Sequence, residues 1–263
     1  MKKFIIALTV AALLLPAGCL GSIPDGYVKI NGGNFIMGSP LSEPDRLPDE
    51  AQRKVKLKSF YMGKFTVTQR EYLEVMGVNP SSFTGGWFPV ENVNWYDAIE
   101  YCNRLSKRHG FSLAYSITED DTGRIVTWNE KANGFRLPTE EEWEYACRAG
   151  TTTAFNTGNT ITVSQANIKN LIGKTSIVGK YAPNAWGLYD MHGNVWEWCW
   201  DLYKPAPGME ERNGPALTSA NRVIRGGGFG SWEHAVRSAR RDGDAWPDLK
   251  NYNLGFRIVR NVR

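Results

Sequence analysis

The stretch that decides the fold is GLYDMHGNVWEWCWD, residues 187–201. Four of the ten tryptophans of the chain fall between positions 186 and 200. An aromatic run of this density covers too much apolar area to remain in water, so we expect it to lie in the core. Asp190 and Glu197 belong to the same run, and a buried carboxylate without a partner is strongly unfavourable.

Two kinds of cation could compensate these carboxylates. Gly193 permits a sharp turn, so that Asp190, Glu197 and the carbonyls between them could surround a calcium ion, which takes oxygen ligands. Alternatively, each carboxylate pairs with an arginine, a residue of which the chain has many. The spacing alone does not distinguish the two.

The N-terminus is typical of a targeting segment. Lys2 and Lys3 precede an apolar run at positions 4–15 that is too short to span a bilayer. The run Pro16-Ala17-Gly18-Cys19 resembles a bacterial lipobox, although proline replaces the usual leucine, and it predicts acylation of Cys19. An ordinary secretory signal is the alternative.

The lipobox resemblance sets the predicted domain organisation. Residues 1–18 form a lipoprotein signal peptide, residues 19–24 form a tether, and residues 25–263 form one domain. The domain is then expected in the cell envelope, held by the Cys19 lipid at the outer membrane surface.

The charge of the chain gives no reason to expect a nucleic-acid partner. The net charge of +4 falls to +2 without Lys2 and Lys3, because 31 minus 2 basic residues then face 27 acidic ones. The positive charge is concentrated at residues 222–263. Arginines of this segment could line a ligand face or bind buried carbonyls and carboxylates.

Hydrophobic patterning predicts several strands. Alternation of apolar and polar residues predicts a hairpin over residues 27–38, with its turn at Gly32 and Gly33. Residues 55–65 are predicted to form a strand that pairs with this hairpin. A second hairpin is expected over residues 114–127.

Helices and an irregular loop complete the predicted secondary structure. Capping boxes predict helices after Thr68 and after Thr139. Apolar residues at three- and four-residue spacing predict a longer helix over residues 92–110, and they make Cys102 a packed thiol. Residues 151–183 show no period and are expected to be irregular.

Five motifs in order resemble the formylglycine-generating enzyme (sulfatase-modifying factor) family. They lie at residues 32–38, 89–95, 135–148, 187–198 and 222–228. The resemblance implies a C-type-lectin-like α+β fold, with a twisted antiparallel sheet, two main helices and much irregular loop. It also implies calcium binding through the Asp190 side chain, the Gly193 and Val195 carbonyls and Glu197.

The chain departs from this family at the catalytic positions. The family's enzymes carry a cysteine pair after an Arg-Gly-Gly motif, and matching that motif to residues 225–227 places Ser231 and Val236 there. Neither residue can hold copper or act as a thiolate. The related iron enzymes of thiol-histidine synthesis use several histidines, and the three in this chain have no converging spacing. We therefore predict that the protein is not an enzyme.

The tail, residues 222–257, resembles the variable region of proteins diversified by retroelements. Those proteins vary exposed positions that descend from asparagine codons, and most residues between the two framing motifs of this tail are reachable from such codons. The predicted ligand-binding positions are Gly228, Phe229, Gly230, Ser231, Trp232, His234, Ala235, Asp242, Gly243, Asp244, Ala245, Trp246, Asp248, Leu249 and Tyr252. Trp232 and Trp246 are the expected anchors on one face of the protein. An ordinary polar loop of similar composition stays an alternative.

The sequence as a whole predicts a non-catalytic, lipid-anchored surface protein that binds a ligand through its tail. The expected partner is a protein or glycan at the cell surface, the expected cofactor is a structural calcium ion, and the chain is expected to be a monomer. Two alternatives stay open. One is an envelope enzyme or maturation factor of the formylglycine-generating type, and the other is a structural envelope lipoprotein whose tail arginines are internal ties.

Overall fold

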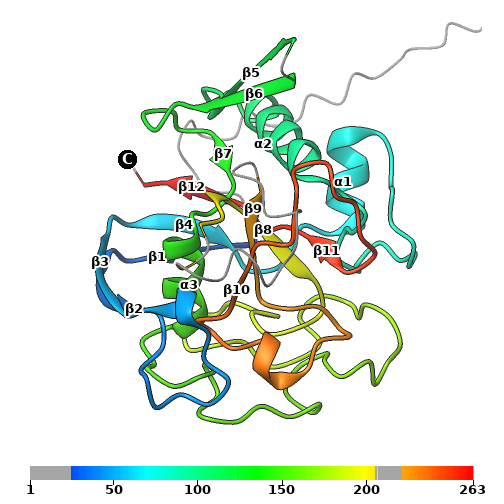
Figure 1. The fold of residues 1–263 in the computed structure, drawn as a ribbon. Coiled ribbons are helices and arrows are strands. Elements are labelled where there is room, and N and C mark those ends of the chain that lie inside the picture. The colour runs from blue at the N-terminus through cyan, green and yellow to red at the C-terminus, as the bar shows by residue number, and fades with distance from the viewer. Residues whose placement is uncertain (1–24, 122, 205, 207–220, 263) are drawn as a thin grey trace, which may run out of the picture.

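The computed structural model describes residues 25–121, 123–204, 206 and 221–262. The predicted signal peptide, the predicted tether and Cys19, the predicted acylation site, lie outside the described residues. The described chain combines short strands, three α-helices and long irregular segments (Figure 1). None of the helices in the described ranges has both the length and the apolar character needed to span a membrane.

A four-stranded sheet joins the first and last described strands of the chain. Its order is β1 (Tyr27–Ile30), β4 (Phe60–Gly63), β12 (Val259–Asn261) and β7 (Phe135–Arg136), with antiparallel pairing throughout. Alternate residues of β4 point to the same face of the sheet, so Phe60 and Met62 both enter the core. β12, the last strand in the chain, lies between β4 and β7 inside this sheet.

A second four-stranded sheet contains the tryptophan-rich run. Its order is β10 (Arg241–Asp242), β9 (Arg222–Arg225), β8 (Trp196–Leu202) and β11 (Leu254–Gly255). Pairing is antiparallel except between β11 and β8, which run parallel. Trp198 is fully buried, and its indole N–H donates to the carbonyl of Val93 at 2.9 Å. The prediction that this run lies in the core is confirmed.

The predicted hairpin within residues 27–38 is wrong. β1 pairs with β4, whereas β2 (Gly33–Met37) pairs with β3 (Arg53–Leu57), so the chain bends here instead of reversing. Neither Gly32 nor Gly33 has a positive φ, which a two-residue hairpin turn requires. Gly32 instead permits a close approach, because a Cβ atom there would lie 2.5 Å from the Leu57 carbonyl oxygen.

The three predicted helices are present. They are α1 (Gln69–Met76), α2 (Trp95–Arg108) and α3 (Glu140–Arg148), and each begins with a capping box. α1 packs on α2, and α3 lies against β2, β3 and β8 (Figure 1). α2 buries Trp95 and Cys102 completely, so the packed thiol is confirmed.

The single strand predicted over residues 55–65 is instead two strands, β3 and β4, which pair with β2 and β1. The predicted second hairpin and the irregular loop agree with the fold. β5 (Tyr115–Asp120) and β6 (Gly123–Trp128) form the expected hairpin. Residues 149–195 are all described, and none belongs to a helix or an extended strand. This long irregular segment packs beside the tail.

Replacing Gly32 with alanine tests the corrected role of this glycine. The new methyl group would meet the backbone of residues 57–59, which cannot move aside cheaply, so the free energy of unfolding should fall by about 1–3 kcal/mol. Urea unfolding measures the change. Gly86→Ala is the control, because the nearest atom to its Cβ would lie 3.8 Å away. Equal stability of the two variants would contradict the close approach.

Candidate functional site

A buried ion pair lies at the centre of the predicted calcium site. Glu197 and Arg257 are both fully buried. The guanidinium of Arg257 donates one hydrogen bond to each carboxylate oxygen of Glu197, and both bonds are 2.7 Å long. The indole N–H of Trp143 donates to the same carboxylate at 2.7 Å. The other N–H groups of Arg257 donate to the carbonyls of Gly63, Lys64 and Tyr189. For Glu197, the geometry therefore matches the arginine alternative that the sequence left open.

Asp190 has different surroundings. Its Oδ2 accepts a hydrogen bond from the backbone N–H of Gly179 at 2.7 Å, and it forms no ion pair with any described residue. Burial raises the pKa of the Asp190 carboxyl to about 6, although the Gly179 N–H and Arg257 lower it. Asp190 thus carries a buried charge at neutral pH that is only partly compensated.

The donor set of the predicted calcium site is incomplete in this arrangement. Gly193 makes the expected sharp turn, with a φ of 88°. The Asp190 carboxylate and the carbonyls of Gly193 and Val195 are potential oxygen ligands, but Glu197 does not fit a calcium ion while Arg257 holds it. Within the described ranges, no three His, Cys, Asp or Glu side chains lie close enough to hold a metal. Calcium at this site stays a prediction.

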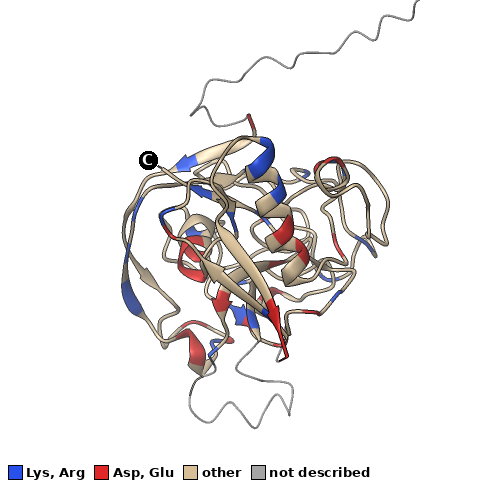
Figure 2. Cartoon of the chain, turned by 90° about the horizontal axis from the view of Figure 1, so that it is seen from above, with Lys and Arg blue, Asp and Glu red and all other residues tan. Residues whose placement is uncertain are grey.

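The tail arginines bind the interior of the domain. Arg225 is fully buried and donates to Glu144 at 3.1 Å and to the carbonyl of Ser238 at 3.2 Å. Glu144 also accepts from Arg148 at 2.9 Å, so α3 and β9 share one charge network. In the part of the chain that Figure 2 colours by charge, basic and acidic segments are interspersed. These arginines anchor the tail.

The predicted ligand-binding positions differ in exposure. Those exposed to solvent are Gly230, Trp232, His234, Asp244, Trp246, Asp248 and Tyr252. Those partly exposed are Ser231, Ala235, Asp242 and Leu249, and those buried are Gly228, Phe229, Gly243 and Ala245. The four buried residues offer little surface to a ligand in this conformation, and the ligand-binding set as a whole stays a prediction.

The buried positions have packing roles that the sequence did not show. A Cβ atom at Gly243 would lie 2.0 Å from the ring of Tyr203, and at Gly228 it would lie 3.0 Å from the Asn253 side chain. Ala245 is fully buried in the core around α2. These buried residues pack against the interior of the domain and so hold the tail backbone in place.

Aromatic rings join the two exposed parts of the tail. The ring of Phe229 lies 5.8 Å from that of Tyr252, and the ring of Phe83 contacts both. Trp232 and Trp246, however, rest on different supports. Trp232 adjoins η3 (Glu233–Ala235), whereas the loop that follows Trp246 bonds to the start of α2 through Pro247.

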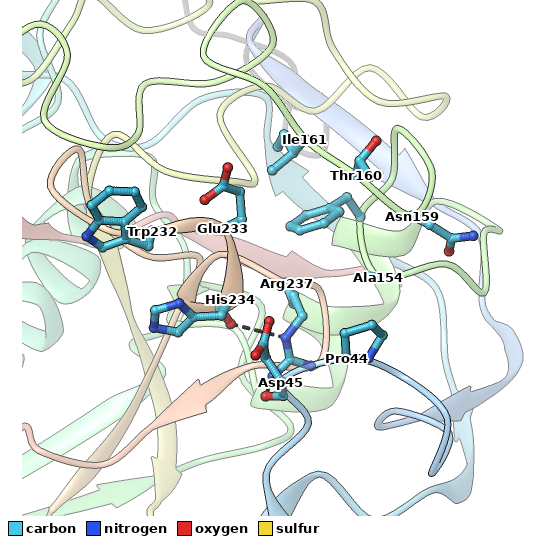
Figure 3. A pocket seen from close by; sticks show the side chains of 11 residues that line it. Pro44, Asp45, Ala154, Asn159, Thr160, Ile161, Trp232, Glu233, His234 and Arg237 are labelled. Atoms are coloured by element: carbon cyan, nitrogen blue, oxygen red, sulfur yellow. Dashed lines mark hydrogen bonds between the residues drawn. The ribbon is translucent and has the colours of Figure 1, made fainter.

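A pocket of about 610 Å³ opens beside Trp232. It is lined by residues 232–234 and Arg237 of the tail, by Pro44 and Asp45, and by the loop at 154–161 (Figure 3). Sequence analysis did not identify the last two segments, because neither has a hydrophobic period or a recognisable motif. The pocket brings three distant segments to one place.

The positions that match the family's cysteine pair have structural roles here. The Ser231 hydroxyl accepts from the backbone N–H of Gly228 at 3.0 Å, and Val236 is fully buried. Sequence analysis did not identify the contact between Cys147 and His192, whose Sγ and Nε2 lie 3.7 Å apart. Burial raises the pKa of Cys147 to about 12 and lowers that of His192 to about 4. A buried neutral pair of this kind is not an activated nucleophile.

Arg257→Met tests which cation compensates Glu197. A buried carboxylate without its arginine should lower the free energy of unfolding by about 3–5 kcal/mol, in EDTA as well as in excess calcium. Denaturant unfolding in both solutions measures this. Arg104→Met, which removes a half-exposed pair with Glu100, should cost less than about 1 kcal/mol. A loss that vanishes in excess calcium would instead favour calcium as the partner of Glu197.

Comparisons with known proteins bear on both the fold and the site. Residues 20–262 match the sulfatase-modifying factor enzyme 1-like domain. The chaperone protein LppX of Paenibacillus barcinonensis is 35% identical, over 99% of this chain and 100% of that protein. The formylglycine-generating enzyme of Thermomonospora curvata is 29% identical, over 90% of this chain and 94% of that protein. The structure of Treponema denticola variable protein 1 is 29% identical, with a TM-score of 0.77 over 89% of this chain and 94% of that one.

These similarities confirm the predicted α+β, C-type-lectin-like fold of the formylglycine-generating enzyme type. They extend over both sheets and the tail, so the five sequence motifs marked a relationship of the whole domain. The relatives include an enzyme as well as a variable protein. The chain belongs to the family of sulfatase-modifying factor enzyme 1-like domains.

Proposed function

We propose that the chain is a non-catalytic, lipid-anchored envelope protein that binds a polypeptide through its tail. The observation that carries this proposal is a set of exposed aromatic side chains on a firmly held backbone. Trp232 is 60% exposed, Tyr252 is 51% exposed and Trp246 is 45% exposed. Exposed Trp and Tyr side chains dominate binding hot spots, and a rigid support limits the entropy that is lost on binding.

The similarities support this proposal over the alternatives. The variable protein shares the fold over nearly its whole length, which agrees with a recognition surface in the tail. The relative named as a chaperone favours a polypeptide partner over a glycan. Ser231 and Val236 supply no thiol where the family's enzymes have their cysteine pair, which argues against the enzymatic alternative.

We also infer that the exposed tail positions are the diversified ones. His234, Asp244, Asp248 and Tyr252 are exposed and reachable from asparagine codons, although the Tyr252 ring also packs on Phe229. Lipid anchoring at Cys19 would place this surface outside the membrane. A diversified surface would then meet partners in the envelope or at the cell surface.

Replacing both tail tryptophans with alanine tests the binding surface. In the full mature chain, Trp232→Ala with Trp246→Ala should weaken binding of a permanently unfolded polypeptide, such as carboxymethylated lactalbumin, by about tenfold or more. Fluorescence anisotropy measures the affinity, and circular dichroism verifies the fold. Trp87→Ala is the control, because Trp87 is 55% exposed and lies outside the tail. Unchanged binding by the folded double variant would contradict the proposal.

Sequencing the tail-coding segment in several isolates tests diversification. Substitutions should gather at the exposed positions His234, Asp244 and Asp248, where a new side chain has room in the solvent. Gly243 and Ala245 should stay constant although they are reachable from the same codons, because a larger side chain would not fit there. A uniform tail, or equal variation at buried and exposed positions, would count against diversification.

A further inference from the structure

The pocket beside Trp232 has apolar walls and acidic groups. Phe155 and Ile161 are buried side chains of the irregular loop that form one wall, and Trp232 lies on the tail side. Figure 3 shows Trp232 and Glu233 on one side of the opening and Ile161 and Thr160 on the other. Such walls suit the aliphatic part of a side chain about as long as lysine or arginine.

The charge around the pocket is negative. Arg237 lines it, but this arginine is held by Glu43 and Glu50, with contacts of 2.6 Å to each. Its single positive charge is therefore more than balanced. The Asp45 carboxylate also lines the pocket, and it has neither a hydrogen bond nor an ion pair with another described residue. A cationic group could bind there without displacing an existing partner.

Lys169 already places a cation next to two residues that line the pocket, Trp232 and Glu233. The ammonium group of Lys169 pairs with the Glu233 carboxylate, and it lies 5.5 Å from the centre of the Trp232 ring. The pocket thus combines a carboxylate with an aromatic face, an arrangement that attracts cations. Asp45 supplies a second carboxylate that lacks such a cation.

We propose that this pocket takes the side chain of a lysine or arginine from an extended polypeptide. The aliphatic stem packs against Phe155 and Ile161, and the cationic head pairs with Asp45. This inference rests on the proposed function and adds a preference for basic segments to it. Because the charge pair is partly open to water, its contribution to affinity should depend on salt.

A pair of matched peptides tests the preference. One short unstructured peptide carries a central arginine, and the other carries citrulline, which has the same shape and no charge. The mature chain should bind the arginine peptide about fivefold more tightly, and raised salt should reduce the difference. Asp45→Asn should remove most of this preference and leave the affinity for the citrulline peptide unchanged.

Two controls separate the pocket from general effects of charge and folding. Glu119→Gln removes the same charge on the distant β5–β6 hairpin and should keep the preference. Asparagine tolerates the left-handed backbone of Asp45, whose φ is 58°, so Asp45→Asn should keep its fold. Glu233→Gln offers a second change in the same pocket, and it should also reduce the preference.

The possible results distinguish this inference from the proposed function. Equal affinity of the wild type for both peptides, together with binding of unfolded lactalbumin, would overturn the basic preference and leave polypeptide binding intact. Failure to bind any of the three polypeptides would overturn both. Binding of a neutral oligosaccharide in the pocket, by a chain that binds neither peptide, would also overturn the inference.

Discussion

The rest of the structure depends on the buried ion pair between Arg257 and Glu197. Glu197 lies on β8 of one sheet, and Arg257 precedes β12 of the other, so the pair fastens the two sheets together. The same guanidinium bonds to the end of β4, and the same carboxylate accepts from Trp143 of α3. Every charge and donor in this cluster has a partner inside the protein. Its formation therefore requires both sheets and α3 to be in place together.

The same chemistry fixes both ends of the tail. At the start of the tail, Arg225 of β9 pairs with Glu144 of α3. At the end of the tail, Arg257 pairs with the buried Glu197. Between these ties, glycines and small residues pack beneath the loop and leave Trp232 and Tyr252 in contact with solvent. Much of the entropy of ordering this surface is thus lost on folding, before any ligand binds. A rigid frame around exposed side chains suits a surface whose residues change while its fold stays constant.

Local signals in the sequence predicted local structure well. The capping boxes at Thr68 and Thr139 depend on residues three positions apart, and both formed as expected. The hairpin at residues 27–38 failed because each of its strands prefers a partner farther along the chain. Glu197 could be recognised as buried, but its partner lies 60 residues away and no spacing pattern identifies it. The pocket was missed for a similar reason, since it unites loops that have no periodicity.

Under the proposed function, the tail would use the family fold for recognition in place of chemistry. Where the enzymes of the family carry paired thiols, Ser231 closes a turn and Val236 fills the core. The remaining Cys147 and His192 contact each other out of reach of solvent. Under the proposed non-catalytic function, the segment between Gly228 and Val236 would not need to hold reacting atoms in a fixed geometry. If the tail is diversified as proposed, its exposed side chains would be constrained by their ligand and its buried ones by packing, so diversification and stability would act on separate residues.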